Sequence, residues 1–153
     1  MANPSKQKGT AGETAVVRWF RCHGFAQADR QPLRGNRDAG DIDLAPGIVL
    51  EVKAYRLPLG VPTTAQLATW LGQCEAERVN AGAVHCPLIV KRPGTADVGR
   101  WHAYLTLGDF ATLTGALVPQ GADEHPVMVP VALLATILRS CGYGDALTTL
   151  EAS

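Results

Sequence analysis

The sequence has no apolar stretch long enough to cross a lipid bilayer. Its longest apolar runs, such as Ile48 to Leu50 and Val129 to Leu138, fall far short of the roughly 20 residues that a membrane-spanning helix needs. The N-terminus passes directly into polar residues and lacks the apolar core of a signal peptide. These absences argue against a membrane-spanning protein, and we expect a cytoplasmic location.

Closely spaced cysteine pairs are also missing. The four cysteines stand at positions 22, 74, 86 and 141, which favours buried reduced thiols over a disulfide framework. Cys22-His23 and His85-Cys86 together contain the residue types of a zinc site. Adjacent residues on one helix or strand rarely face the same metal ion, however, so these pairs give only weak support for zinc.

The chain has no net charge, because 14 basic residues balance 14 acidic ones. A polyanionic partner would therefore have to be met by a local patch rather than by the field of the whole protein. Residues 1–56 contain nine basic and six acidic residues, a balance of +3, which leaves −3 for the remainder. Positive charge is thus concentrated in the first third of the chain.

Length and composition predict one globular domain over residues 1–153. The chain is 46% hydrophobic and 18% charged, which is typical of a single soluble domain and not of a disordered chain. We expect residues 1–9 to form a flexible arm, and Thr10 to Glu13 to form a capping box that opens a helix ending near Gly24. Residues 27–40 are expected to form a long basic loop.

The central part of the chain predicts a hairpin and a second helix. Asp41 to Leu44 and Ile48 to Tyr55 are β-rich runs separated by the turn Ala45-Pro46-Gly47. Thr63 or Thr64 caps a helix that extends to about Asn80, with apolar residues at helical spacing.

Two further strands, a short helix and a terminal extension are expected in the second half. The strands cover Val84 to Arg92 and Arg100 to Leu107, and Asp109 is predicted to cap the short helix. Residues 115–153 are expected to form a C-terminal extension with a helix over Val129 to Tyr143. Its apolar side chains would complete the core or form a subunit interface.

Acidic and basic side chains converge in the predicted hairpin. Side chains alternate along a strand, so Glu51 and Lys53 share one face, and the hairpin brings Asp41 or Asp43 close to Glu51. Two neighbouring carboxylates repel one another unless a cation joins them. Oxygen ligands with open positions suit Mg²⁺ or Mn²⁺, and Lys53 could orient a nucleophile and offset charge in the transition state.

Glu13 could supply a third carboxylate. It precedes the apolar positions of the first helix by helical spacing, so it can lie at the edge of the face that packs on the sheet. Alternatively, it serves only as the return half of the capping box.

These residues resemble the PD-(D/E)XK nuclease superfamily, and within it the archaeal-type and phage-encoded Holliday junction resolvases. The resemblance rests on Lys8-Gly9-Thr10 with Glu13, on Gly40-Asp41-Ile42, and on Glu51-Val52-Lys53. The sequence departs from the motif at Gly40, where the motif has proline. The resemblance covers roughly the first half of the chain.

The resemblance implies an α/β, restriction-endonuclease-like fold with a mixed central sheet flanked by helices. It implies a Mg²⁺-dependent endodeoxyribonuclease that acts as a homodimer on four-way DNA junctions, in recombination, repair or phage DNA processing. Asp41, Glu51 and Lys53 would be catalytic together with Glu13, and the three acids would hold the metal.

DNA contacts are expected in the basic first third of the chain, because lysine and arginine bind phosphates. The candidates are Lys8, Arg30, Arg34 and Arg37. Two alternatives remain open: a restriction or repair nuclease that acts on linear or branched duplex DNA, and a catalytically inactive DNA-binding module.

Overall fold

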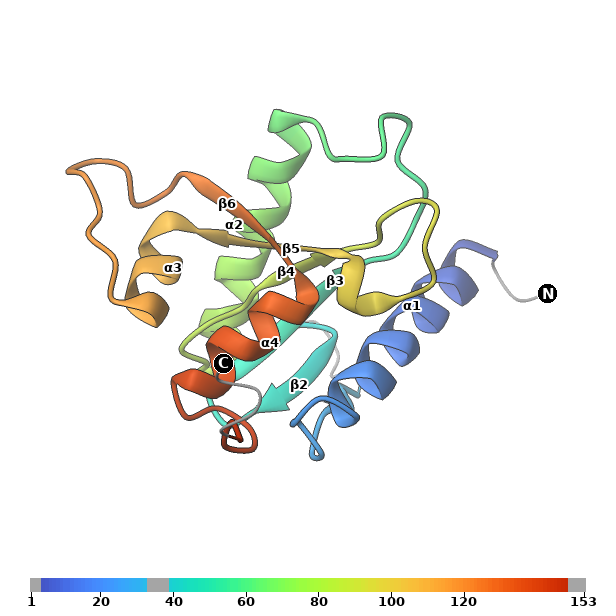
Figure 1. Ribbon diagram of the computed structural model, residues 1–153. Helices are drawn as coiled ribbons and strands as arrows, with labels where there is room; N and C mark the ends of the chain where they lie inside the picture. Colours follow the sequence, from blue (N-terminus) through green and yellow to red (C-terminus); the bar gives the residue numbers. More distant parts are fainter. Residues whose placement is uncertain (1–3, 33–38, 149–153) are drawn as a thin grey trace.

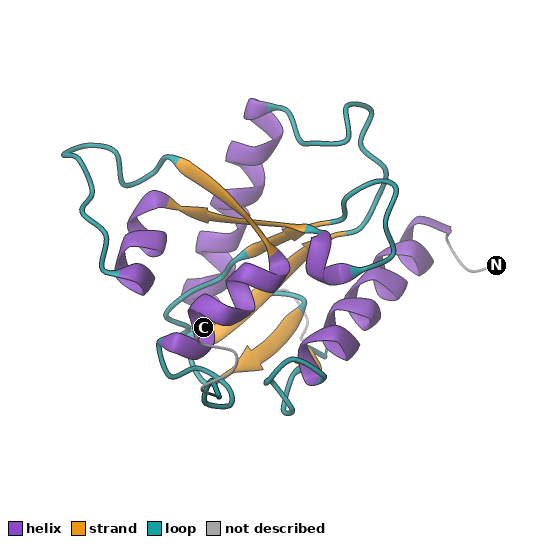
Figure 2. Cartoon of the chain, in the orientation of Figure 1, coloured by secondary structure: helices purple, strands orange, loops and turns teal. Residues whose placement is uncertain are grey.

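The computed structural model describes residues 4–32 and 39–148, apart from the side chains of residues 4–6 and 8. In this part of the chain a six-stranded mixed sheet is flanked by four α-helices (Figures 1 and 2). The strands follow chain order across the sheet: β1 Asp29–Arg30, β2 Ile42–Ala45, β3 Ile48–Lys53, β4 Leu88–Val90, β5 His102–Thr106 and β6 Pro126–Pro130. The helices are α1 Pro4–Arg21, α2 Thr64–Ala81, the 3₁₀ helix η1 Val98–Arg100, α3 Leu107–Thr114 and α4 Val131–Ser140. The predicted α/β class and mixed sheet are confirmed.

Strand β3 lies in the middle of the sheet. It pairs antiparallel with β2 and parallel with β4, and α2 lies in the connection between β3 and β4. Helix α2 is built as the sequence predicts: the Thr63 hydroxyl accepts a hydrogen bond from the Gln66 amide, and Gly82 ends the helix with a positive φ of 63°. Positive φ favours glycine because glycine has no Cβ.

Helices cover both faces of the sheet (Figure 1). On one face, side chains of α1 and α4 such as Phe20 and Leu138 pack with Leu50 of β3 in the main core. On the other face, Trp70 and Cys74 of α2 pack with residues of β4 and β5. Strand β3 is therefore buried from both sides, and polar groups on it are largely removed from water.

The predicted start of the first helix is wrong. Helix α1 begins at Pro4, so residues 4–9 are helical instead of forming the expected arm, and Thr10 and Glu13 lie inside the helix. Proline is tolerated in the first helical turn because its missing N–H would have no helical partner there. The Thr14 hydroxyl donates to the Thr10 carbonyl within the helix, so the expected capping box does not form.

Part of the predicted C-terminal extension belongs to the domain core. Pro126–Pro130 forms the edge strand β6, and α4 buries Val131, Leu134 and Leu138 against the sheet. The apolar face of α4 thus completes the core, which was one of the two expected roles. Prolines at both ends of β6 conceal the strand in the sequence, since proline is allowed at sheet edges but is unfavourable in strands generally.

Two smaller corrections concern the caps and the basic loop. The side chain that caps α3 is Thr106, which accepts from the Asp109 amide, so Asp109 lies in the first turn. Residues 29 and 30 of the predicted loop form β1 and pair with β2.

None of the helices in the described ranges is long and apolar enough to span a membrane.

A buried glycine lets α1 approach β3 closely. A Cβ built on Gly12 would lie 2.1 Å from Cβ of Ala54, so we expect Gly12→Ala to destabilise the protein by about 1–3 kcal/mol through overpacking. Gly72 of α2 has no neighbour within 4 Å, and Gly72→Ala should stabilise by about 0.5–1 kcal/mol because alanine loses less conformational entropy in a helix. Urea denaturation of the two variants measures this contrast, and equal effects would contradict the close approach.

Candidate active site

Asp41 and Glu51 lie side by side at the start of the hairpin. Ile42 pairs with Leu50 in the β2–β3 register, which places Asp41 opposite Glu51. The Asp41 amide donates to the Leu50 carbonyl at 2.9 Å, and Oδ2 of Asp41 accepts from the Val52 amide at 2.8 Å. These two bonds fix the Asp41 carboxylate against the middle of β3. We refer to Asp41 and Glu51 as the carboxylate pair.

The Glu51 side chain is buried, and its two oxygens have different surroundings. Oε1 accepts from Nζ of Lys53 at 2.5 Å, as expected for residues two apart on one face of a strand. Oε2 is buried and accepts from no N–H donor among the described residues, and its carboxyl neighbours Asp41 and Glu77 can donate to Glu51 only when they are protonated. A buried carboxylate oxygen without a donor is costly, so this oxygen is well suited to accept a cation.

Burial raises both carboxyl pKa values, and the charge of a neighbouring carboxylate adds to each shift. The pKa of Asp41 rises from 3.8 to about 7, chiefly through burial and then through the charge of Glu51, while the Val52 amide opposes the shift. Burial also raises the pKa of Glu51 from 4.5 to about 7, against the effect of Lys53. The pair therefore retains protons near neutral pH unless another positive charge replaces them.

Lys53 stays protonated beside this pair. Burial lowers its pKa, but the hydrogen bond and charge of Glu51 outweigh burial, so that the net shift is upward. Its amine lies 5.9 Å from the centroid of the Trp70 ring, whose side chain α2 places under the site. Lys53 is thus a fixed cation at the edge of the carboxylate pair.

Glu13 lies near the pair but is bound by an arginine. Its Oε2 accepts from Nε of Arg30 at 2.8 Å and from Nη2 at 2.6 Å. The charge of Glu13 is close enough to contribute to the raised pKa of Asp41. The three predicted acids nevertheless do not form a group whose ligand atoms all lie within 4.8 Å. Within the described ranges, that criterion selects a different set: Cys74, Glu77 and Cys86.

The structure also separates the two aspartates that the sequence left as alternatives. Asp43 is exposed and pairs with Val49 and Asp29 in the sheet register. Asp41, and not Asp43, is the aspartate beside Glu51.

The structure describes the side chain of only one of the four residues that were expected to contact DNA. Arg30 is exposed on β1 and binds Glu13. Lys8 belongs to α1, but its side chain lies outside the described part of the chain, as do Arg34 and Arg37. The sequence left open whether Lys91 and Arg92 contact DNA or are only solvated. The Lys91 amide donates to the Lys53 carbonyl at 2.9 Å, which places Lys91 at the same end of the sheet as the site.

Sequence reasoning missed a buried acid next to the site. Glu77 of α2 is 4% exposed, and its charge adds to the raised pKa of Glu51. Sγ of Cys86 donates to Oε2 of Glu77 at 3.8 Å. The available signal was the spacing Cys74-x-x-Glu77, which puts both side chains on one helix face. We refer to Cys74, Glu77 and Cys86 as the thiol cluster.

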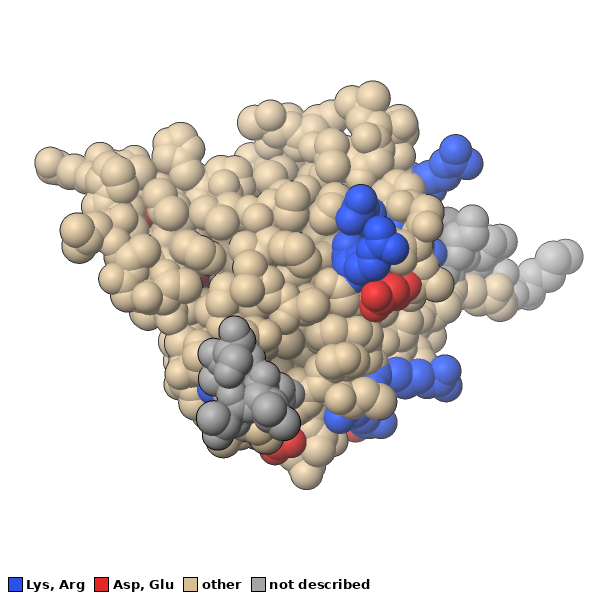
Figure 3. All heavy atoms as spheres, viewed as in Figure 1, with Lys and Arg blue, Asp and Glu red and all other residues tan. Residues whose placement is uncertain are grey.

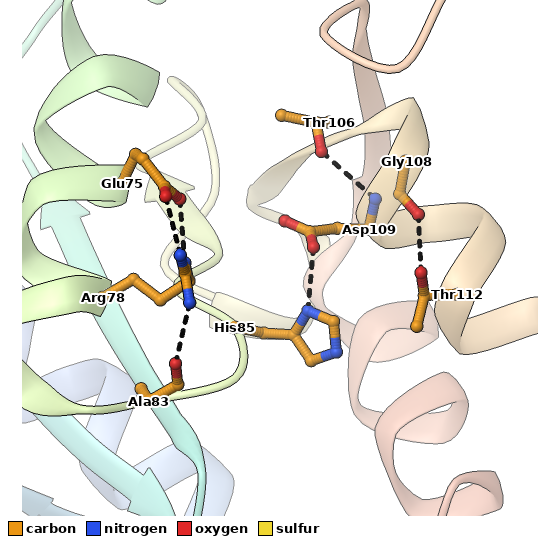
Figure 4. A network of polar contacts seen from close by, with 8 residues as sticks. All are labelled: Glu75, Arg78, Ala83, His85, Thr106, Gly108, Asp109 and Thr112. Atoms are coloured by element: carbon orange, nitrogen blue, oxygen red, sulfur yellow. Dashed lines mark hydrogen bonds and ion pairs between the residues drawn. The ribbon is translucent and has the colours of Figure 1, made fainter.

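The two Cys-His pairs do not form a common site. Cys22 and His23 are exposed at the end of α1, where the His23 ring stacks on Trp19. His85 binds Asp109 of α3 at 3.0 Å, as Figure 4 shows, while Cys86 contacts Glu77.

Comparison of the chain with protein-family models, with curated proteins and with solved structures found no match.

Proposed function

We propose that this protein is a metal-dependent endonuclease with a restriction-endonuclease-like fold, which hydrolyses phosphodiester bonds in branched DNA. The single observation that carries the proposal is the carboxylate pair, in which one buried oxygen of Glu51 has no N–H donor and Lys53 lies 2.5 Å from the other. The acids and the amine come from a hairpin beneath a helix that carries Glu13, which is the arrangement that the resemblance implies.

The donor set fits Mg²⁺ or Mn²⁺. Both ions prefer carboxylate oxygens and retain several waters, so they need only one or two protein carboxylates. Asp41 and Glu51 would hold the ion, which when bound would acidify a water and offset charge on the phosphate. A cation would also compensate the two buried negative charges and the repulsion by Glu51 that adds to the raised pKa of Asp41.

The other residues of the site would orient the carboxylates, the attacking water and the phosphate. The Val52 amide orients Asp41, and the ion pair with Glu51 holds the Lys53 amine in place. From this position Lys53 can orient the attacking water and stabilise negative charge as it develops on the phosphate. Glu13 positions Arg30 at the rim through two contacts, and a guanidinium has five N–H donors with which it can also bind a phosphate.

Basic side chains near the site support a path for DNA. Figure 3 shows lysine and arginine side chains gathered on the side of α1 and of the segment between β4 and β5. Lys91 and Arg92 follow β4 directly, and Arg56 follows β3 shortly after Lys53. We assign DNA contact to this side, with Lys8, Arg30, Arg34 and Arg37 as further contributors.

The zero net charge favours recognition of DNA shape through this localised patch over non-specific binding along a duplex. A four-way junction is the branched substrate that we propose. A homodimer would place one site on each of two opposed strands, and we therefore expect cuts in pairs.

A cleavage assay with matched substrates tests the proposal. The protein is incubated with a labelled four-way junction and with linear duplexes of the same arms, in Mg²⁺ or with a chelator. We expect paired cuts on opposed strands of the junction, little cutting of the linear duplexes, and none with the chelator.

The other outcomes separate the alternatives. Equal cutting of both substrates would contradict junction selectivity and favour a restriction or repair nuclease. Binding of the junction without cutting in Mg²⁺ or Mn²⁺ would contradict the nuclease and favour a DNA-binding module.

A further inference from the structure

The thiol cluster joins two separate parts of the fold. Cys74 and Glu77 lie on one face of α2, buried against the sheet at 3% and 4% exposure. Cys86 lies in the segment that leads into β4. The Sγ atoms of both cysteines and a carboxylate oxygen of Glu77 all lie within 4.8 Å of one another.

Backbone hydrogen bonds fix the third member of the cluster. The Val49 amide donates to the His85 carbonyl at 3.2 Å, and the Glu51 amide donates to the Pro87 carbonyl at 3.1 Å. The segment on either side of Cys86 is therefore held along β3. A ligand fixed in this way requires little reorganisation when an ion binds.

The chemistry of the three groups selects a thiophilic ion. Cysteine sulfur, together with a carboxylate oxygen, is a ligand set used for Zn²⁺, whereas Mg²⁺ avoids sulfur. Zinc ligands in a tetrahedral site lie about 3–4 Å apart, given metal–ligand distances of about 2.0–2.3 Å. The separation in the thiol cluster needs only a small closure to reach this spacing.

A cleft gives the cluster access to solvent. Its volume is about 810 Å³, and both Cys74 and Cys86 line it. Figure 4 shows its two sides, with Glu75 and Arg78 on α2 facing Asp109 on α3. Its lining has four acidic residues against one arginine, an excess of negative charge that favours the entry of a cation: Glu75, Asp109, Asp123 and Glu124 against Arg78.

We propose that Cys74, Glu77 and Cys86 bind a Zn²⁺-class ion at the base of this cleft, which ties α2 to the start of β4. Each thiol releases its proton to solvent as its sulfur binds the ion. Water from the cleft would complete the coordination of the ion. This site is distinct from the carboxylate pair in its ligands, and it does not depend on the proposed nuclease activity.

Cobalt substitution tests the proposal without using cleavage as a readout. Co²⁺ is added to the metal-free, reduced full-length protein, and the absorption spectrum is recorded. We expect a sulfur-to-cobalt charge-transfer band at one equivalent of Co²⁺, which Zn²⁺ abolishes. Oxygen ligands give no such band, so cobalt at Asp41 and Glu51 cannot produce it, and Asp41→Asn should keep the band.

Matched cysteine variants provide the controls. Cys74→Ser and Cys86→Ser should each lose the band, while Cys22→Ser, at an exposed cysteine, should keep it. Glu77→Gln should weaken Zn²⁺ affinity by about tenfold or more, with the far-ultraviolet circular dichroism of every variant recorded as a check on folding.

Three results would overturn the proposal: a wild-type protein without the band, a band that persists in Cys74→Ser and Cys86→Ser, or a Cys74–Cys86 disulfide in the protein isolated without reductant. None of them would bear on cleavage in Mg²⁺, so the two proposals fail independently.

Discussion

Lys53→Met is expected to lower the rate of DNA cleavage by about 10²–10³-fold, the usual cost of removing one preorganised charge from an active site. The methionine side chain retains the apolar stem that packs near Trp70, so the fold should persist while the amine is lost. DNA affinity should change little, because the amine bound to Glu51 acts mainly on the reacting phosphate. Single-turnover cleavage at saturating DNA measures the rate separately from binding.

Lys91→Met is the matched control for this variant. Lys91 lies at the end of the neighbouring strand, with its amine 5.8 Å from the centroid of the Trp101 ring, so both substitutions remove an amine above a tryptophan. We expect Lys91→Met to weaken DNA binding by less than about tenfold and to preserve the rate at saturation. Wild-type rates for Lys53→Met would remove Lys53 from the mechanism.

Asp41→Asn is expected to stabilise the metal-free protein above neutral pH while abolishing cleavage. The asparagine oxygen can still accept from the Val52 amide, but the cost of burying a negative charge is removed, together with the repulsion by Glu51. We expect an increase of about 1–3 kcal/mol in the free energy of unfolding at about pH 8, since one pKa unit is worth about 1.4 kcal/mol.

The contribution of the carboxylate pair to the free energy of unfolding depends on pH in a defined direction. Both folded pKa values, about 7, lie above their ordinary values of 3.8 and 4.5. Between these limits the folded state binds more protons than the unfolded state, so the contribution of the pair to stability falls as pH rises. Asp41→Asn should reduce this fall.

Urea denaturation in chelator at about pH 5 and about pH 8 measures the effect. Asp43→Asn is the control, because Asp43 is exposed two residues away, and it should change stability by less than about 0.5 kcal/mol. Destabilisation of Asp41→Asn at the higher pH would show that the charge of Asp41 is not a source of strain.

The hairpin and the positions of Asp41, Glu51 and Lys53 could be predicted from the sequence, because they depend on local rules. Strand alternation places Glu51 and Lys53 on one face. The turn at Pro46-Gly47 sets Ala45 opposite Ile48, and an irregularity between Asp43 and Ala45 then shifts the register by one residue and brings Asp41 to Glu51. The choice between Asp41 and Asp43 needed the actual register of the pair.

Contacts between distant parts of the chain could not be predicted in this way. Arg30 reaches Glu13 only because β1 pairs with β2 beside α1, and no local pattern specifies that pairing. The thiol cluster likewise depends on how α2 packs over β3 and β4. The start of α1 and strand β6 were missed for a different reason, since proline at Pro4, Pro126 and Pro130 usually signals a break but is tolerated at a helix start and at a sheet edge.

Binding of Mn²⁺ to the carboxylate pair is the measurement that tests the central claim most directly. Titration calorimetry is carried out on the metal-free protein at about pH 8, where the carboxyl groups are largely ionised. The account predicts a Mn²⁺ site that Mg²⁺ competes for, that Asp41→Asn and Glu51→Gln each lose, and that Asp43→Asn retains. Absence of Mn²⁺ binding to the wild-type protein, or equal binding to Asp41→Asn, would contradict the account.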